Sequence, residues 1–187
     1  MTAETQNRGI RRPSWRIIGW SIPIILLMIP LSANAPWTLS DFIFMALLMG
    51  AVGLGIEFAV RKGNAVYSMA SAVALAAAFL LVWINAAVGI IGSEEEDVNM
   101  LFLLVPVVAL LGSLGSLFRP LGMAWTMVAA ALAQAIVPLI AWSMRPDLAA
   151  WIWHPAVLML TGFFIGMWLL SAWLFRTSTH RGDAARR

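Results

Sequence analysis

Six long apolar runs, separated by short polar gaps, make up most of the 187-residue sequence. An α-helix rises about 1.5 Å per residue, so roughly 20 residues cross a hydrocarbon core of about 30 Å. The stretches that fit this length are 16–34, 42–60, 65–91, 100–118, 121–144 and 154–175. The gaps at 61–64 and 119–120 are short enough to predict antiparallel helical hairpins. The pattern therefore predicts an all-α membrane protein, with a six-helix transmembrane bundle at 16–175 between a basic N-terminus at 1–15 and a basic tail at 176–187.

The charged residues of the gaps alternate in sign along the chain. Of the 12 Lys and Arg residues, 11 lie at the chain ends or in two of the gaps: Arg8, Arg11, Arg12, Arg16, Arg61, Lys62, Arg119, Arg176, Arg181, Arg186 and Arg187. The other three gaps carry Asp41, then the run Glu94–Asp97, then Asp147 with Arg145. Cytoplasmic loops of membrane proteins carry an excess of Lys and Arg. The alternation therefore predicts cytoplasmic N- and C-termini and places the acidic run on the outer face.

Polar side chains mark the starts of three predicted helices. Ser40 and Asp41 are suited to cap the second helix and Asn64 the third, because their oxygens can accept hydrogen bonds from free backbone N–H groups. Ser93 with Glu96 fits a capping box at the fourth.

Tryptophans lie near the predicted water boundaries, as in the aromatic belts of membrane proteins. They are Trp15, Trp37, Trp125, Trp142, Trp151, Trp153 and Trp173. The segment 147–153 predicts a short helix on the outer leaflet, with its tryptophans turned towards lipid.

The composition agrees with the membrane assignment. The sequence is 61% hydrophobic and 11% charged, whereas soluble domains are about 45–50% apolar and about 25% charged. Its basic residues are spread over loop ends, which favours anionic lipid over nucleic acid as the partner. The chain has no cysteine, which excludes disulfides and thiolate metal sites. His154 and His180 have no partner at metal-ligand spacing, so we expect no metal or other cofactor.

The densest charge is the outer acidic loop, Glu94, Glu95, Glu96 and Asp97. Several carboxylates are what a hard cation such as Ca²⁺ requires, and they could also dock a partner. However, consecutive acids on a short loop point in different directions and lack the alternating spacing of a calcium loop. A solvated helix cap is the favoured interpretation.

Glu57 is the carboxylate within an apolar run. Acidic residues inside membranes often serve proton relay or ion coupling. Arg61 follows four residues later, so a helical pair at the interface would satisfy the charge. The sequence favours this structural pair and leaves a functional role as the alternative.

Asn85 and Gln134 are the other strongly polar side chains within the predicted spans. They lie at different depths from each other and from Glu57, which argues against a shared site at the middle of the membrane. The favoured role is hydrogen bonding between helices, and ligand contact is the alternative. Gly162 and Gly166 form a GxxxG motif, which serves packing inside the bundle or, if it faces lipid, docking of another subunit.

The string WINAAVGIIGSE at 83–94 closes the third predicted span. It resembles a segment of an uncharacterised family of small multipass inner-membrane proteins of Gram-negative bacteria. The similarity extends over the second to fifth spans, including Phe118-Arg119-Pro120. The family's loop continues after Ser-Glu with Asp and Asn, where this chain has Glu95, Glu96 and Asp97. The resemblance implies a bacterial inner membrane and no particular activity.

Within this string, Asn85, Gly89, Gly92 and Ser93 recur at steps of one, three and four residues. On a continuous helix they would share one face near the outer boundary. This polar and small stripe is a candidate contact for a neighbouring helix, a lipid head group or a quinone ring.

No catalytic motif is present: the sequence has no HExxH, GxSxG or Walker loop. We therefore expect a non-enzymatic membrane protein that acts by interaction, as an accessory or lipid-contacting module. Its expected partners are membrane lipids and other membrane subunits or further copies of itself. A small transporter or channel for ions or small solutes is the alternative. A weak echo at a spacing of 59 residues, which pairs Trp83 with Trp142, favours that alternative.

Overall fold

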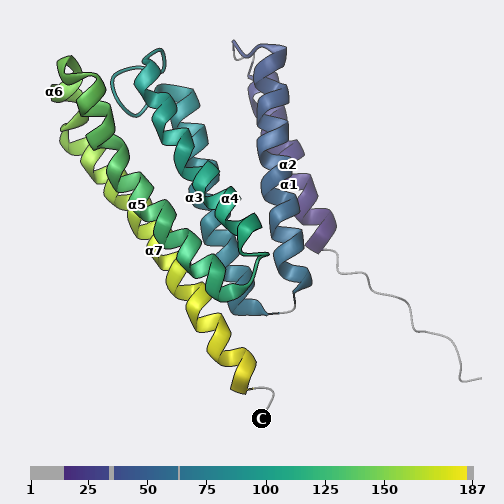
Figure 1. Ribbon diagram of the computed structural model, residues 1–187. Helices are drawn as coiled ribbons and strands as arrows, with labels where there is room; N and C mark the ends of the chain where they lie inside the picture. Colours follow the sequence, from purple (N-terminus) through teal and green to yellow (C-terminus); the bar gives the residue numbers. More distant parts are fainter. Residues whose placement is uncertain (1–14, 34–35, 63, 185–187) are drawn as a thin grey trace, which may run out of the picture. The chain divides into compact units, whose positions relative to one another are not determined.

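The computed structural model describes residues 15–33, 36–62 and 64–184, and all its regular elements are helices (Figure 1). In order they are α1 (Trp15–Ser32), α2 (Leu39–Arg61), α3 (Ala65–Val88), the 3₁₀ helix η1 (Asp97–Leu103), α4 (Leu104–Gly115), α5 (Pro120–Met144), the 3₁₀ helix η2 (Pro146–Leu148), α6 (Ala149–Ile152) and α7 (Pro155–Ala184). The chain divides into an N-terminal unit, Met1–Gly53, and a C-terminal unit, Leu54–Arg187.

Five helices are long and apolar enough to cross a membrane. They are Leu39–Arg61, Ala65–Val88, Asp97–Gly115, Pro120–Met144 and Pro155–Thr179. The apolar part of α1, Gly19–Ser32, is shorter. The prediction of an all-α, multi-pass membrane protein is thus confirmed, with five long apolar helices in the described part of the chain.

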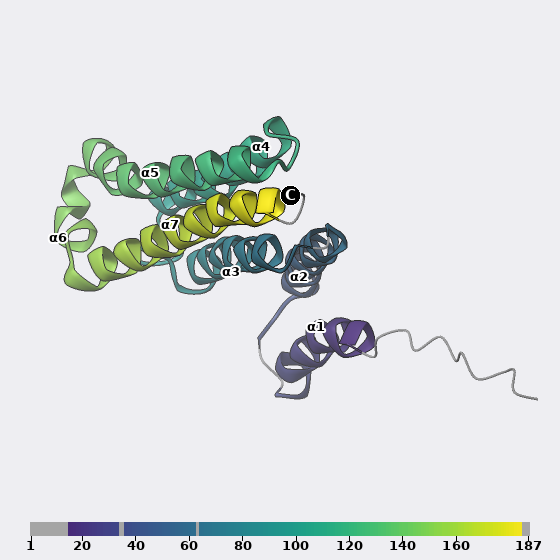
Figure 2. The ribbon, with the colours of Figure 1, turned by 90° about the horizontal axis from the view of Figure 1, so that it is seen from below.

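In the C-terminal unit, α7 packs between α3 and α5, and α4 packs against α5 (Figures 1 and 2). Small residues on α3 and α5 face large ones on α7. The fully buried members of this core include Ala70, Ala77, Ala130, Ala141, Phe164, Trp168 and Phe175. Because lipid gives no hydrophobic drive between helices, such close packing supplies much of their association energy.

Two hydrogen bonds join α7 to α3 and its N-cap. The Ser171 hydroxyl donates to the Ala70 carbonyl at 2.8 Å, and the Asn64 amide donates to the Ser178 carbonyl at 3.2 Å. Asn64 also caps α3, since its side-chain oxygen accepts from the amides of Val66 and Tyr67. The predicted cap of the third helix is therefore confirmed.

The start of α2 differs from the prediction. The helix begins at Leu39, and the residue before it, Thr38, takes the capping position. The Thr38 amide and hydroxyl both contact an Asp41 carboxylate oxygen, at 2.7 and 2.8 Å. Asp41 thus lies in the first turn and closes a reciprocal cap with Thr38, rather than capping the helix with Ser40.

Several helix ends also differ from the prediction. The third helix ends at Val88 instead of residue 91, and the fourth begins as a 3₁₀ turn at Asp97. The last helix continues to Ala184, so most of the predicted tail at 176–187 is helical. The predicted short helix at 147–153 is confirmed as η2 and α6. Of the predicted N-terminal segment, 1–14 lie outside the described residues.

Candidate functional site

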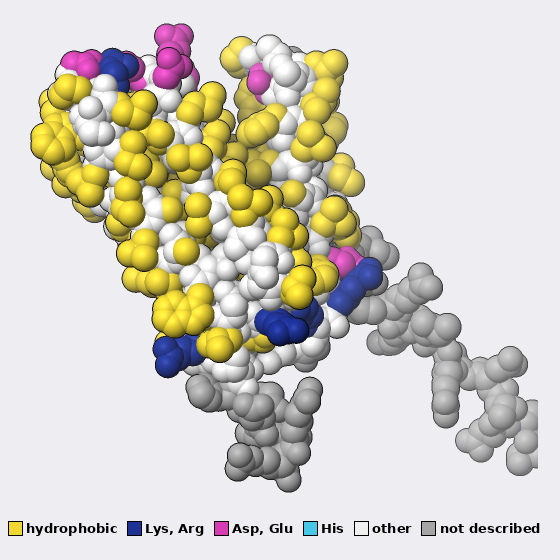
Figure 3. Space-filling model, viewed as in Figure 1, with side chains coloured by type: hydrophobic (Ala, Val, Ile, Leu, Met, Phe, Trp, Pro, Cys, Tyr) yellow, Lys and Arg dark blue, Asp and Glu magenta, His cyan; other side chains and the backbone are white. Residues whose placement is uncertain are grey.

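The two ends of the C-terminal unit carry opposite charge, with apolar side chains over the surface between them (Figure 3). The end at α6 and the α3–η1 loop holds Glu94, Glu95, Glu96, Asp97, Arg145 and Asp147, and the other end holds Glu57, Arg61, Lys62, Arg119 and Arg176. We refer to these as the acidic end and the basic end.

Exposed tryptophans mark two levels between these ends. Trp142 and Trp153 are in ring contact near the acidic end, with centroids 5.9 Å apart. Trp125 lies towards the basic end of α5 and Trp173 towards that of α7. The helical rise separates Trp125 from Trp142 by about 26 Å. This spacing approaches the thickness of a hydrocarbon core, about 30 Å.

At the acidic end, α3 ends at Val88, within the predicted polar stripe. Gly89 has φ of 70° and Gly92 has φ of 71°, in a region that L side chains rarely adopt. A Cβ on Gly89 would lie 2.5 Å from the Ser93 carbonyl oxygen. The prediction that Asn85, Gly89, Gly92 and Ser93 share one helix face is therefore wrong, because only Asn85 lies on α3.

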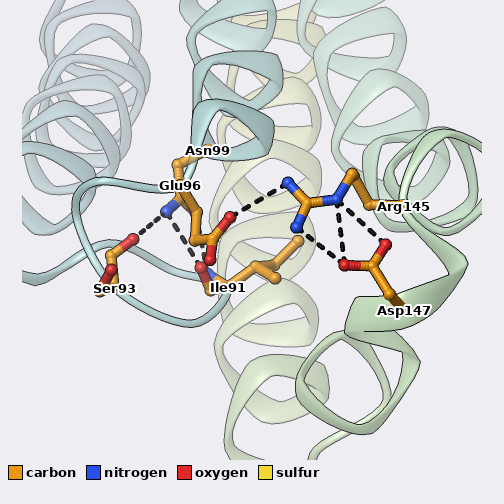
Figure 4. A network of polar contacts seen from close by, with 6 residues as sticks. All are labelled: Ile91, Ser93, Glu96, Asn99, Arg145 and Asp147. Atoms are coloured by element: carbon orange, nitrogen blue, oxygen red, sulfur yellow. Dashed lines mark hydrogen bonds and ion pairs between the residues drawn. The ribbon is translucent and has the colours of Figure 1, made fainter.

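Asn99 of η1 holds this loop in place (Figure 4). Its Oδ1 accepts from the backbone amides of Ile90 and Ile91, at 3.0 and 2.8 Å. Its Nδ2 donates to the carbonyls of Ile91 and Ser93, at 3.1 and 2.6 Å. Asn99 is 3% exposed, so its side chain satisfies these backbone groups at a place that water does not reach. No local pattern in the sequence indicates this role for Asn99.

Arg145 links the loop to the α5–α7 connection (Figure 4). Its guanidinium lies 3.2 Å from a Glu96 carboxylate oxygen and 2.8 Å from one of Asp147. The hydrogen bond with Asp147 raises the pKa of Arg145 and lowers that of Asp147. Glu96 makes no side-chain cap at η1, so the predicted capping box with Ser93 is wrong.

The other acids of the loop, Glu94, Glu95 and Asp97, are exposed. Among the described residues, no group of three or more acids, histidines or cysteines is arranged to hold a metal ion. The loop thus divides into one carboxylate that pairs with Arg145 and three that face solvent.

At the basic end, the predicted pair of Glu57 and Arg61 is present. The two side chains approach to 3.0 Å, and the Glu57 side chain is 18% exposed against 69% for Arg61. In this pair the Glu57 carboxylate is largely shielded by the protein, whereas the Arg61 side chain is exposed.

Lys62 is anchored beside this pair. Its Nζ donates to the Phe118 carbonyl at 2.7 Å and lies over the Phe58 and Tyr67 rings, 5.3 and 4.9 Å from their centroids. The Tyr67 hydroxyl donates to the same carbonyl at 3.1 Å. That carbonyl is presented by a turn in which Leu117 and Phe118 have φ of 51° and 56°. Burial lowers the pKa of Lys62.

Polar side chains also lie inside the bundle. Gln134 is fully buried on α5, and both of its amide atoms are without a hydrogen-bond partner among the described residues. The same holds for Thr161 Oγ1 and Trp168 Nε1 on α7 and for Asn85 Oδ1 on α3. Gln134 therefore does not form the predicted hydrogen bonds between helices within the described part of the chain. Ser171 and Asn64 instead provide hydrogen bonds between α7 and the α3 segment.

Gly162 and Gly166 lie on the outer face of α7. A Cβ at either position would meet nothing within 4 Å in the described part of the chain. Large apolar side chains surround them, including the exposed Met159 and Phe163. Of the two predicted roles, packing inside the bundle is excluded for this unit, because its helices bind the opposite face of α7.

Comparisons with models of protein families, with curated proteins and with solved structures find no match to this chain.

Proposed function

We propose that the chain is an integral protein of a bacterial inner membrane, with six spans and both termini in the cytoplasm. It acts without catalysis, as an accessory or lipid-contacting subunit that joins other membrane subunits through its helices. The resemblance of 83–94 to inner-membrane proteins supports the location. The 18 residues of α1 rise about 27 Å, within the range of a transmembrane helix.

The topology is supported by the opposite charges of the two ends and the two tryptophan levels between them. Because the chain has no cysteine, single cysteines report sidedness without background. Glu95→Cys and Arg119→Cys replace exposed residues at opposite ends. A membrane-impermeant maleimide should label the first in right-side-out vesicles and the second in inverted vesicles. The reverse pattern would overturn the proposed orientation.

The interaction role rests on one observation, the outward Gly162–Gly166 surface of α7. Exposed glycines at a spacing of four allow a second helix to approach closely, and such contacts are a main source of association energy in lipid. The occupant that fits this surface is a transmembrane helix of another subunit.

This role is tested by extracting the protein from its native membrane in mild detergent. The wild-type chain should purify with another chain, or a second copy, in fixed ratio. Gly162→Leu with Gly166→Leu should abolish that association while thermal unfolding of the chain is unchanged, because no side chain occupies the space. Ala129→Leu, at an exposed position of α5, is the matched control and should keep the partner. A wild-type chain that purifies as a lone monomer would refute the proposal.

Transport is a second candidate, favoured by the unpaired polar groups of Gln134 and Thr161. Gln134 lies about 12 Å along α5 from Trp142, and Thr161 lies about 9 Å along α7 from Pro155. The two groups therefore lie at similar depth near the middle of the unit, as a polar path requires. Protons are the probe, followed with a pH-sensitive dye inside proteoliposomes. A flux that Gln134→Leu removes would support transport, and a wild-type flux equal to that of empty vesicles would exclude a proton path.

A further inference from the structure

We propose that Lys62, Arg119 and Arg176 form a binding site for the phosphate of an anionic phospholipid at the basic end. The proposal rests on the membrane location proposed above and specifies which lipid the chain contacts and where. The proposed ligand is a phospholipid with net negative charge. The three cations contact its phosphodiester group.

Phe58, Tyr67, Phe118 and Phe175 form one aromatic cluster, which Lys62 contacts and which Arg119 and Arg176 adjoin in the sequence. Lys62 lies over the Tyr67 ring and donates to Phe118. The Tyr67 and Phe175 rings are in edge contact, with centroids 5.1 Å apart. Arg119 and Arg176 directly follow Phe118 and Phe175 in the sequence. The contacts of the cluster thus place the backbones of Arg119 and Arg176 on the same end of the unit as Lys62, although the three residues lie far apart along the chain.

The charges of this site are available for an anion. Among the residues whose side chains the structure describes, the basic end holds the carboxylate of Glu57, and it pairs with Arg61. Arg119 and Arg176 are exposed, and neither forms an ion pair with any side chain that the structure describes. Lys62 gives one N–H to the Phe118 carbonyl, and an ammonium group has three. Each cation therefore keeps donors free for phosphate oxygens.

The depth of the site also fits a lipid head group. Arg119 precedes Trp125 by about 9 Å along the chain, and Arg176 follows Trp173 by about 4.5 Å. Exposed tryptophans lie at the level of the interface. The cations are therefore just outside the apolar layer, at the depth of lipid phosphates, and the exposed Phe58 beside Lys62 offers an apolar surface to the chains. Basic sites between helices on the cytoplasmic side are suited to anionic head groups.

The test is native mass spectrometry of the full-length chain in mild detergent, titrated with phosphatidylglycerol or with phosphatidylethanolamine of the same acyl chains. The wild-type chain should bind phosphatidylglycerol more tightly. Each of Arg119→Gln and Arg176→Gln should weaken that binding about fivefold. Arg61→Gln is the matched control, because it removes the same charge at the same end from a residue already paired with Glu57, and it should weaken binding less than twofold.

Equal binding of the two lipids, or an equal loss in the Arg61→Gln control, would overturn the proposal. Inorganic phosphate is added in a parallel series. Its failure to displace phosphatidylglycerol at millimolar concentration is expected, and displacement there would identify a site for free phosphate instead. Arg119 and Arg176 are exposed and form no side-chain hydrogen bond or ion pair within the described part of the chain, so their variants should fold. The measurement does not involve Gly162 or Gly166, so loss of lipid selectivity and loss of the partner chain are separate outcomes.

Discussion

Replacing Asn99 should destabilise the acidic end more than any other single change in the loop after α3. Asn99→Ala removes four hydrogen bonds at once, and it leaves the amides of Ile90 and Ile91 without their acceptor. Ile90 is 7% exposed and Ile91 is fully buried. Water therefore cannot replace the lost partners without opening the loop.

The size of this effect follows from the bonds. A neutral hydrogen bond contributes about 1 kcal/mol net, and a buried donor left unpaired costs about 1–3 kcal/mol. Asn99→Ala loses four hydrogen bonds and leaves two buried donors unpaired. We therefore expect it to lower the free energy of unfolding by about 3–5 kcal/mol. Equilibrium unfolding in mixed detergent micelles measures it. Glu95→Ala, an exposed neighbour, is the control and should stay within about 0.5 kcal/mol of wild type.

Asn99→Asp keeps the shape of the side chain. It distinguishes the two hydrogen bonds that Asn99 accepts from the two that it donates. The new carboxylate could still accept from Ile90 and Ile91, but when charged it would face the carbonyls of Ile91 and Ser93. The carbonyls of Ile91 and Ser93 would then lose their donor. We therefore expect Asn99→Asp to lower the free energy of unfolding by more than about 1 kcal/mol in the same assay. A cost below about 1 kcal/mol for Asn99→Ala would refute the role assigned to Asn99.

Three further outcomes are expected. Gln134→Met removes an amide that is buried without a partner, so it should raise the free energy of unfolding by about 1 kcal/mol in detergent; a loss of stability would show that Gln134 is hydrogen-bonded. The hydrogen bond from Arg145 lowers the pKa of Asp147 below its ordinary 3.8, so this pair stabilises the turn at η2 above pH 3.8 and ceases to do so as pH falls further. Amide hydrogen exchange at 145–149, corrected for intrinsic rates, should therefore quicken below that pH, and unchanged protection would contradict the pairing. Glu57→Gln should cost less than about 1 kcal/mol in thermal unfolding, because Arg61 is largely exposed; a larger cost would indicate a further role for Glu57.

Local features of the sequence predicted the helices and one ion pair. A membrane helix needs about 20 consecutive apolar residues. Each apolar run can be tested for this length and hydropathy by itself, so the sequence alone identifies these helices. Glu57 and Arg61 are four residues apart on one helix, so their contact follows from helical geometry alone. Asn64 caps α3 for the same reason, since its partners are the next amides of the chain.

The end of α3 could not be found in this way. Residues 88–91 read Val-Gly-Ile-Ile, which continues the apolar run. The helix stops because Gly89 adopts a positive φ and Asn99, eight to nine residues later, binds the amides of Ile90 and Ile91. The contact of Arg145 with Glu96 spans 49 residues, and no local pattern indicates it.

The orientation of α7 shows most clearly why a sequence motif in a membrane helix leaves function open. Gly162 and Gly166 promote close packing wherever they face, while Phe164 and Trp168 are apolar enough to face either lipid or protein. Hydropathy cannot choose between these faces, because the bilayer and the bundle core are both apolar. In the structure the small residues of α3 and α5 receive the aromatic face of α7, and both glycines are left on the outside. A helix that already packs on two neighbours thus presents a second packing surface, and that surface is the reason to look for another membrane subunit.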